Sequence, residues 1–262
     1  MDKNYFFSNN KIGGDKLKDN YTELYNLFLN IKKKRWIKSL REGPTGIGYT
    51  FESLINKKED NLREPDFKGI EIKTMKYLTN KTIHLFSMTP NGDMPNPIRT
   101  VLEALGYPDK NNNYYKVLNV SITANKYTSL GLYKKLKLEI NWKKERIELN
   151  AYHTIKGKYY FDISWSFKEL KKIYETKINQ LAIVKACYKR VKKEDYFYYN
   201  KIEFYKQKNF ETFIKLIEQG IIKITFKIQC QIDSDNNKKI HDRGTDFSIE
   251  YENISLLFEQ VK

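Results

Sequence analysis

The hydrophobic positions of the chain recur at two spacings, one typical of amphipathic helices and the other of half-buried strands. Apolar residues three or four positions apart predict helices over residues 15–38, 45–57, 98–105, 166–178 and 210–218. Alternation of apolar and polar residues predicts strands over residues 70–73, 83–88, 117–124, 131–141, 146–152, 196–205 and 222–232. A continuous apolar run at residues 181–184 predicts a central strand that is buried on both faces. The pattern therefore predicts an α/β chain with a mixed, partly antiparallel central sheet flanked by helices.

The strand predicted over residues 70–73 carries two charged side chains on one face. Glu71 and Lys73 lie two positions apart and alternate with two isoleucines. Because side chains two apart on a strand point to the same side, Glu71 and Lys73 should project together while the isoleucines enter the core. This strand therefore presents a carboxylate and an ammonium group side by side.

A turn before this strand supplies a second carboxylate. Lys68-Gly69 is a plausible turn, because glycine adopts a positive φ without steric cost. Such a turn folds Asp66 back towards Glu71. Two carboxylates suit Mg²⁺, which binds through one or two carboxylates and substrate phosphate. In such a site Lys73 would orient a metal-bound water or lower its pKa.

The helix predicted over residues 45–57 offers a third carboxylate. Its apolar residues recur at helical spacing, and Glu52 lies next to that stripe. From there Glu52 could reach the edge of the sheet and bind a second metal or hold a water. The alternative is that all these charges lie on solvated faces, since a D-x4-E-x-K string is short and occurs often by chance.

The strand predicted over residues 83–88 is expected to lie beside the strand of Glu71. It contains His84, which has no histidine, cysteine or aspartate nearby in the sequence that would complete a metal site. We interpret His84 as a packing or edge residue.

The charge of the chain indicates its partner. The 262 residues carry a formal net charge of +16, with a pI near 9.5, and include 20 Tyr and 15 Phe. A globular chain this basic favours a polyanion, nucleic acid first and an anionic membrane surface second. No apolar run is long enough to span a bilayer, and the N-terminus lacks a signal-peptide core, so we expect a cytoplasmic protein without a membrane partner. Cys187 and Cys230 are expected to be free thiols.

A second cluster of polar residues lies near the C-terminus, at residues 241–247. His241, Asp242 and Arg243 precede Gly244 and bring both hydrogen-bond donors and acceptors. Taken alone, the stretch is typical of a capped loop before a final strand and helix. In a DNA-binding protein the same side chains have the donor and acceptor types that G·C pairs require.

Two blocks of the chain resemble a known family. TGIGYTFESL, EDNLREPDF and IEIKT, which contain Glu52, Asp66, Glu71 and Lys73, are similar to the active-site block of the MvaI–BcnI type restriction endonucleases. These belong to the MutH-like branch of the PD-(D/E)xK nucleases. The C-terminal stretch resembles a further block of the group, of the form HDxGTxFxI, and residues 161–186 resemble its strand–helix–strand segment. At Arg243 the chain departs from the family members compared.

The resemblance implies a restriction endonuclease-like, MutH-like fold and a Mg²⁺-dependent type II enzyme that cleaves double-stranded DNA. Asp66 and Glu71 would bind the metal, Lys73 would position or deprotonate the attacking water, and Glu52 would support a second metal or the water. His241, Asp242 and Arg243 would face the bases. The resemblance also implies a monomer, a cognate DNA methyltransferase without a stable complex, and by analogy a CCNGG-type target.

We expect one restriction endonuclease unit over residues 1–262, with two lobes around a DNA cleft. The catalytic lobe would span about 15–190, and the recognition lobe would take parts of 90–160 and 190–262. Two other functions stay open at this stage. One is a MutH-like nicking endonuclease of mismatch repair, and the other is a non-catalytic DNA-binding protein on the nuclease fold.

Overall fold

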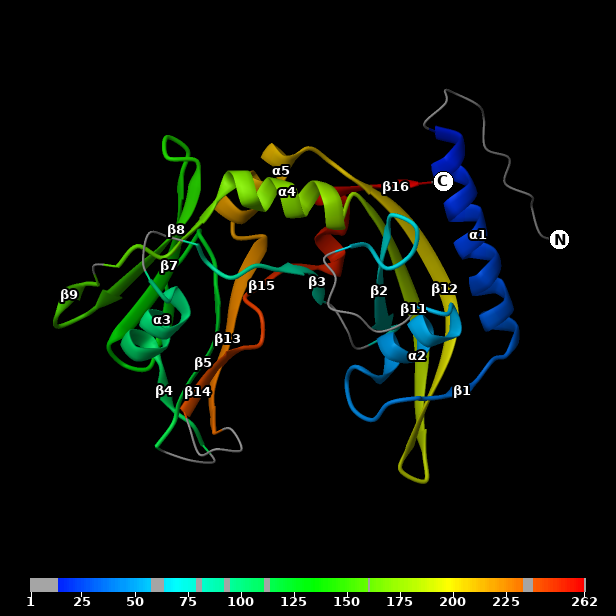
Figure 1. Cartoon of the computed structure of the whole chain (residues 1–262), viewed down its shortest axis with the longest axis horizontal. Helices are drawn as coiled ribbons and strands as arrows, with labels where there is room; N and C mark the ends of the chain where they lie inside the picture. The colour runs from blue at the N-terminus through cyan, green and yellow to red at the C-terminus, as the bar shows by residue number, and fades with distance from the viewer. Residues whose placement is uncertain are drawn as a thin grey trace. The chain divides into compact units, whose positions relative to one another are not determined.

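A computed structural model describes residues 14–57, 64–78, 82–91, 95–110, 114–159, 161–232 and 238–261 (Figure 1). The chain divides into two compact units. Unit 1 comprises Met1–Lys81, Thr176–Gln207 and Phe258–Lys262, and unit 2 comprises Thr82–Glu175 and Lys208–Leu257. No helix in the described ranges is long and apolar enough to cross a bilayer.

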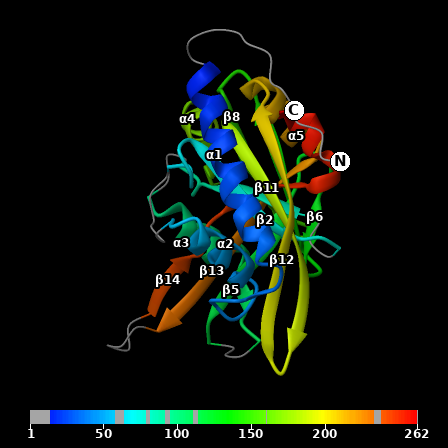
Figure 2. The same cartoon turned by 90° about the vertical axis from the view of Figure 1, so that its right-hand side faces the viewer.

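Unit 1 is built on a mixed sheet with the strand order β1-β12-β11-β2, and β16 also pairs with β12. β2 runs parallel to β11, whereas the other pairs are antiparallel. Figure 2 shows helix α1 lying along this sheet. The elements of unit 1 are α1 (Gly14–Lys33), β1 (Ile37–Lys38), α2 (Gly46–Leu54), β2 (Ile70–Lys76), β11 (Gln180–Val191), β12 (Glu194–Gln207) and β16 (Phe258–Val261).

Two helices cover one face of the unit 1 sheet because each has an apolar stripe at helical spacing. Leu24 and Phe28 of α1 and Phe51 of α2 are buried in one cluster with Ile72 of β2 and Val184 of β11. β11 is buried on both faces from Gln180 to Ala186, which confirms the central strand predicted from the apolar run.

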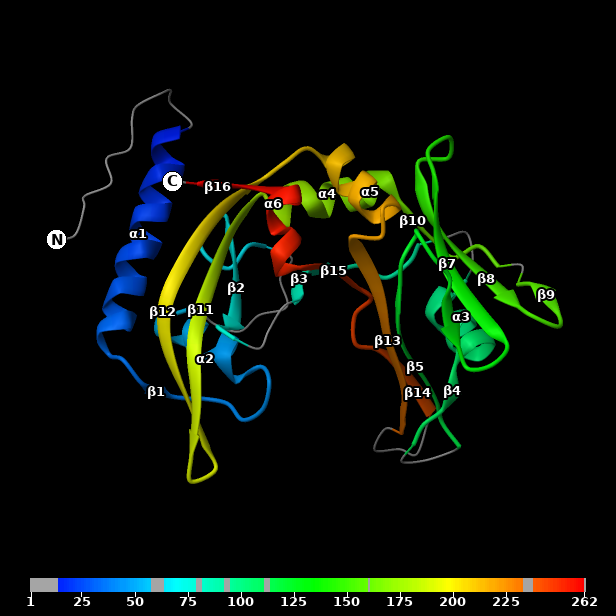
Figure 3. The ribbon, with the colours of Figure 1, turned by 180° about the vertical axis from the view of Figure 1, so that it is seen from behind.

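Unit 2 contains two further sheets, with strand orders β3-β15-β13-β5-β4 and β10-β8-β7-β6, and with β14 on β13 and β9 on β8 (Figure 3). Trp165, Phe226 and Phe247 pack together in its core, and the Trp165 indole donates a 2.9 Å hydrogen bond to the carbonyl of Met88. The elements are β3 (Thr82–Ser87), α3 (Pro97–Leu105), β4 (Tyr107–Pro108), β5 (Lys116–Ile122), β6 (Thr128–Leu130), β7 (Lys134–Asn141), β8 (Arg146–His153), β9 (Gly157–Lys158), β10 (Ser164–Ser166), α4 (Phe167–Lys177), α5 (Phe210–Glu218), β13 (Ile222–Ile232), β14 (Lys238–Asp242), β15 (Asp246–Glu250), η1 (Tyr251–Asn253) and α6 (Ile254–Leu257). The last two residues of α4 belong to unit 1.

The predicted α/β class with a mixed, partly antiparallel sheet is confirmed, and both cysteines are free. One placement was wrong. The strand predicted over residues 83–88, observed as β3, is not in the sheet of β2 but pairs with β15 in unit 2. The neighbour of β2 is β11, over 100 residues away, because its apolar run can be buried on both faces. The predicted division into two lobes around a DNA cleft stays a prediction.

A two-residue turn leads into β2. Lys68 and Gly69 have φ angles of 44° and 88°, and Phe67 and Ile70 exchange backbone hydrogen bonds of 2.9 and 2.8 Å across it. Positive φ at both central residues matches the twist of a tight hairpin. The turn thus reverses the chain where the sequence predicted, and brings Asp66 alongside β2.

Gly69→Ala should therefore destabilise the protein by about 1–2 kcal/mol, because a Cβ strains the left-handed conformation at φ 88°. Urea unfolding would measure the loss. Lys68→Asn is the matched control on the same turn: asparagine tolerates positive φ, and the exposed ion pair of Lys68 with Glu23 contributes little. A Gly69→Ala protein as stable as the control would show that the turn does not constrain the chain.

Candidate active site

β2 brings Glu71 and Lys73 to the sheet face opposite α1 and α2. The strand register places Glu71 level with Leu181 and Lys73 level with Ile183, while Ile72 lies on the helix-covered face. The Lys73 Nζ donates a 2.6 Å hydrogen bond to the Glu71 Oε1. The alternation predicted from sequence is confirmed, but Glu71 is not on a solvated face, since only 2% of the residue is exposed.

Asp66 is positioned by the turn. Its Oδ2 accepts a 2.9 Å hydrogen bond from the backbone N–H of Ile72. Asp66 also influences Glu71 electrostatically, which shows that the turn brings the two carboxylates together as expected. Asp66 is half-buried, so it can present oxygen to solvent or a ligand.

Helix α2 brings Glu52 to the same group of charges. A Cβ on Gly48 would lie 3.3 Å from the Thr74 hydroxyl of β2 and 3.5 Å from the Glu52 Oε1, so glycine lets the helix approach the strand closely here. The charge of Glu52 raises the pKa of Lys73, and the charges of Asp66 and Glu71 raise the pKa of Glu52. The structure therefore assembles all four residues that were predicted to form the site.

One further charged residue at this site was not predicted. Lys177, at the end of α4, has its Nζ 3.9 Å from the Glu71 Oε1. Its position was visible in the sequence only as a lysine in the last turn of a helix, where cations are generally favourable. Its proximity to Glu71 depends on the pairing of β11 with β2, which no local pattern reveals.

Burial and mutual repulsion raise the pKa values of two of the carboxylates, Glu71 and Glu52. Burial raises the pKa of Glu71; Lys73 lowers it and Asp66 raises it, and the net shift is upward. Burial and the charge of Asp66 likewise raise the pKa of Glu52. Burial alone would lower the pKa of Lys73, but the adjacent Glu71 carboxylate reverses this effect, so the pKa is raised and the ammonium is charged at neutral pH.

Residues 241–247, the second polar cluster of the sequence, lie at the junction of β14 and β15 in unit 2. The side chains of His241 and Arg243 are exposed, and the Arg243 N–H donates to the carbonyl of Lys227. The two oxygens of Asp242 accept hydrogen bonds from the Gly244 N–H at 3.0 Å and the Thr89 hydroxyl at 3.1 Å. Asp242 thus orders the turn that presents its two neighbours.

Behind this turn lies a charged network that the sequence did not reveal. Asp246, 7% exposed, accepts hydrogen bonds from Ser87 at 2.5 Å and from Lys227, and its Oδ2 lies 3.3 Å from the His84 Nδ1. His84 was interpreted as a packing or edge residue, and the structure shows it to be largely exposed and paired with Asp246. Asp246 lies on β15 and its partners lie on β3 and β13, so the network joins three segments that are distant in the sequence.

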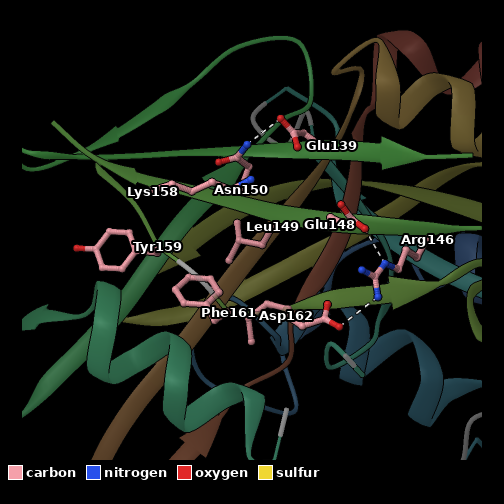
Figure 4. A pocket seen from close by; sticks show the side chains of 10 residues that line it. Glu139, Arg146, Glu148, Leu149, Asn150, Lys158, Tyr159, Phe161 and Asp162 are labelled. Carbon is pink, nitrogen blue, oxygen red and sulfur yellow. Dashed lines mark hydrogen bonds and ion pairs between the residues drawn. The ribbon is translucent and has the colours of Figure 1, made fainter. Parts of the chain in front are cut away.

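A pocket of about 450 Å³ lies in unit 2, on the β8–β10 region. Its polar groups bind one another: Arg146 contacts Glu148 at 2.6 Å and Asp162 at 3.1 Å, and Asn150 contacts Glu139 at 2.7 Å (Figure 4). None of the predicted site residues lines it. The candidate site on β2 and this pocket therefore share no residue.

Comparison with solved structures identifies the class of protein. The fold matches the "Restriction endonuclease MvaI-cognate DNA substrate complex" with a TM-score of 0.82 and 28% identity, covering 92% of this chain and 96% of that chain. It matches "Restriction endonuclease MvaI in the absence of DNA" with a TM-score of 0.58 and 27% identity, at the same coverage of both chains. The architecture is that of a restriction endonuclease.

The family follows from the sequence itself. The MvaI/BcnI restriction endonuclease family model matches residues 26–258, so the chain belongs to that family. No curated protein matches the chain. The expected restriction endonuclease fold is confirmed, and the assignment to the MutH-like branch stays a prediction.

Asp246 should stabilise unit 2 in a pH-dependent way. Burial would raise its pKa, but hydrogen bonds from His84, Lys227 and Ser87 lower it to about 2. A carboxylate with a folded-state pKa below its ordinary value of about 3.9 stabilises the fold above that pH, and the contribution is lost as the pH falls towards 2. Asp246→Asn should therefore cost about 2 kcal/mol at pH 7 and much less at pH 2.

The free energy of unfolding in urea at both pH values would test this. Glu211→Gln is the matched control, because its pair with Lys215 is exposed on helix α5 and should change stability by less than about 0.5 kcal/mol at either pH. A loss in Asp246→Asn that is equal at pH 7 and pH 2 would show that the charge of Asp246 is not what stabilises the unit.

Proposed function

We propose that the protein is a Mg²⁺-dependent type II restriction endonuclease that hydrolyses phosphodiester bonds of double-stranded DNA at a short specific site. The observation that carries the proposal is the convergence of Asp66, Glu71 and Lys73 on one edge of β2, with Glu52 from α2 beside them. Membership of the MvaI/BcnI family and the likeness to an MvaI–DNA complex support a DNA-cleaving enzyme.

The residues present fit a divalent metal. The Glu71 Oε2 is buried and receives no hydrogen bond from any residue in the described ranges, and a buried, unpaired carboxylate oxygen is costly unless a cation binds it. No group of three or more His, Cys, Asp or Glu suited to a metal occurs among those residues, but Mg²⁺ needs only one or two carboxylates plus phosphate oxygens. We assign metal binding to Asp66 and Glu71, with Glu52 supporting a second metal or the water.

When bound, Mg²⁺ would supply charge neutralisation at the scissile phosphate and lower the pKa of water. The chain's own residues define the rest of the chemistry. Lys73 remains an ammonium at neutral pH, so we assign it to positioning the attacking water and a phosphate oxygen rather than to deprotonation. Lys177 adds a second cation on the buried Glu71 and offsets part of the negative charge of the site.

We further propose that His241, Asp242 and Arg243 read base edges in the major groove. Arg243 and His241 present exposed donors for guanine N7 and O6, and Asp242 both orders their turn and can accept from cytosine N4. A CCNGG-type target is proposed by analogy with the group. The same analogy supports a monomer, with a cognate methyltransferase that forms no stable complex. We also propose that the protein is cytoplasmic.

A plasmid cleavage assay with and without Mg²⁺ tests the proposed function. Linear products of defined length, formed only with Mg²⁺, are expected, and end-mapping of one sequenced DNA would identify the cut sequence. Nicked circles that never become linear would favour the MutH-like alternative. Intact plasmid, together with tight DNA binding, would favour a non-catalytic binding protein.

Replacing the charged site residues by neutral glutamine should almost abolish cleavage. Glu71→Gln and Lys73→Gln should each lower the single-turnover rate by about 10³-fold or more, since metal and charge effects contribute several kcal/mol. DNA binding and thermal unfolding should change little. Glu23→Gln, an exposed carboxylate on α1 that contacts Lys68 of the adjacent turn, should cleave normally. Near-normal cleavage by Glu71→Gln would overturn the assignment of the site.

Arg243 should determine sequence discrimination. A bidentate arginine–guanine contact contributes about 1–3 kcal/mol of discrimination, so Arg243→Ala should lose cognate binding by about tenfold or more relative to random DNA. Both affinities are measured at one salt concentration. If cognate and random DNA weaken by the same factor, Arg243 contacts a phosphate and does not read sequence.

A further inference from the structure

The hairpin of β11 and β12 continues well past the catalytic strand. β2 pairs with β11 only as far as Lys76 with Ala186, whereas β11 runs on to Val191. The hairpin closes through Lys192 and Lys193, both with positive φ. Figure 3 shows this end of the hairpin projecting beyond β2 and α2. We call residues 187–198 the hairpin arm.

One face of the hairpin arm continues the face that carries the active site. Lys73 is paired with Ile183 on β11, and Lys189 lies six residues further along the same strand. Because side chains on a strand alternate, an even separation keeps Lys189 on the face of Lys73. At about 3.3 Å per residue the two lie roughly 20 Å apart along the strand.

Aromatic rings hold Lys189 in place on this face. Its Nζ lies 4.4 Å from the ring centroid of Trp36 and 5.7 Å from that of Tyr196, and Trp36 packs at 6.0 Å against Tyr198. Cation–π contacts of this kind restrict an ammonium group without neutralising its charge. Trp36 is 39% exposed, so the cluster faces solvent.

The arm also keeps its positive charge. Its two carboxylates are already bound, Glu194 by Lys38 at 2.5 Å and Asp195 by Arg190 at 2.6 Å. Within the part of the chain that the structure describes, Lys189, Lys192 and Lys193 form no ion pair. Their side chains are exposed, and the result is a cationic surface on an arm with no carboxylate left to neutralise it.

We propose that the face of the hairpin arm that carries Lys189 and packs against Trp36 contacts the phosphate backbone of duplex DNA outside the recognition sequence. The inference rests on the proposed function. A distance of 20 Å corresponds to about six base pairs from the scissile phosphate, at 3.4 Å per pair along the helix. That is beyond the reach of a short target site, so the arm adds affinity for flanking DNA without adding sequence information.

The alternative is that the lysines only keep a long hairpin from pairing with other chains, a common role of lysine at sheet edges. Two duplexes that contain the mapped cut sequence distinguish the two roles, one with a single flanking base pair on each side and one with fifteen. Binding is measured without divalent metal, so that the DNA stays intact, at several salt concentrations. Wild type is compared with Lys189→Gln, Lys189→Arg and Lys76→Gln.

Lys189→Gln should weaken binding of the long duplex about fivefold to tenfold at 0.1 M salt and reduce the log–log salt slope by about 0.9, the effect of one phosphate contact. The short duplex should be bound as by wild type, and Lys189→Arg should restore the long duplex. Lys76→Gln is the matched control, because Lys76 also lies over an aromatic ring, that of Tyr188, but on the opposite face of the sheet. It should bind both duplexes normally.

Equal losses on short and long duplexes, or no loss at all, would overturn the role of the arm while leaving the nuclease assignment intact. If the wild-type protein neither cleaves nor binds DNA, the proposed function itself fails, and the inference fails with it. A thermal unfolding curve unchanged in Lys189→Gln identifies any loss as a binding effect.

Discussion

The parallel pairing of β2 with β11 is the constraint on which the site depends. β11 is buried on both faces over the paired residues, so β2 is held against a fully buried strand of unit 1. Ile70 and Ile72 enter the helix-covered core, and each buried isoleucine contributes about 1.5–3 kcal/mol. Alternation then forces Glu71 and Lys73 to the other face. Burial of the isoleucines on one side of the strand thus offsets the free-energy cost of burying the charged Glu71, and part of Lys73, on the other.

Two buried carboxylates, Asp246 and Glu71, illustrate different uses of burial. Asp246 receives donors from Ser87 and Lys227 and lies beside His84, so its pKa is low and its charge stabilises the fold. Glu71 has one oxygen bound by Lys73 and the other without a donor, and its pKa is raised. A buried carboxylate whose two oxygens both accept hydrogen bonds from the protein is typical of a structural role. A buried carboxylate with one oxygen that lacks a donor is typical of a ligand-binding site.

Sequence reasoning succeeded where the determinants are local. The alternation at residues 70–73 and the Lys68-Gly69 turn depend on neighbouring residues only, and both were predicted correctly. It failed where two distant segments meet. The partner of β2, the sheet of β3 and the contact of Lys177 with Glu71 all depend on pairings between segments far apart, which periodicity does not encode. The charge state of Lys73 also needed the structure, because it results from burial and three nearby carboxylates acting in opposite directions.

The two-residue turn between Phe67 and Ile70 makes the spacing of the site intolerant of insertions. Lys68 and Gly69 are the whole loop, and Asp66 reaches the N–H of Ile72 only because no further residue intervenes. One added residue within β2 would exchange the two faces, placing the carboxylate of Glu71 among the helices and an isoleucine at the site. Substitutions in this segment can therefore alter the site by degrees, whereas adding or removing one residue would reverse which side chains of β2 face the site.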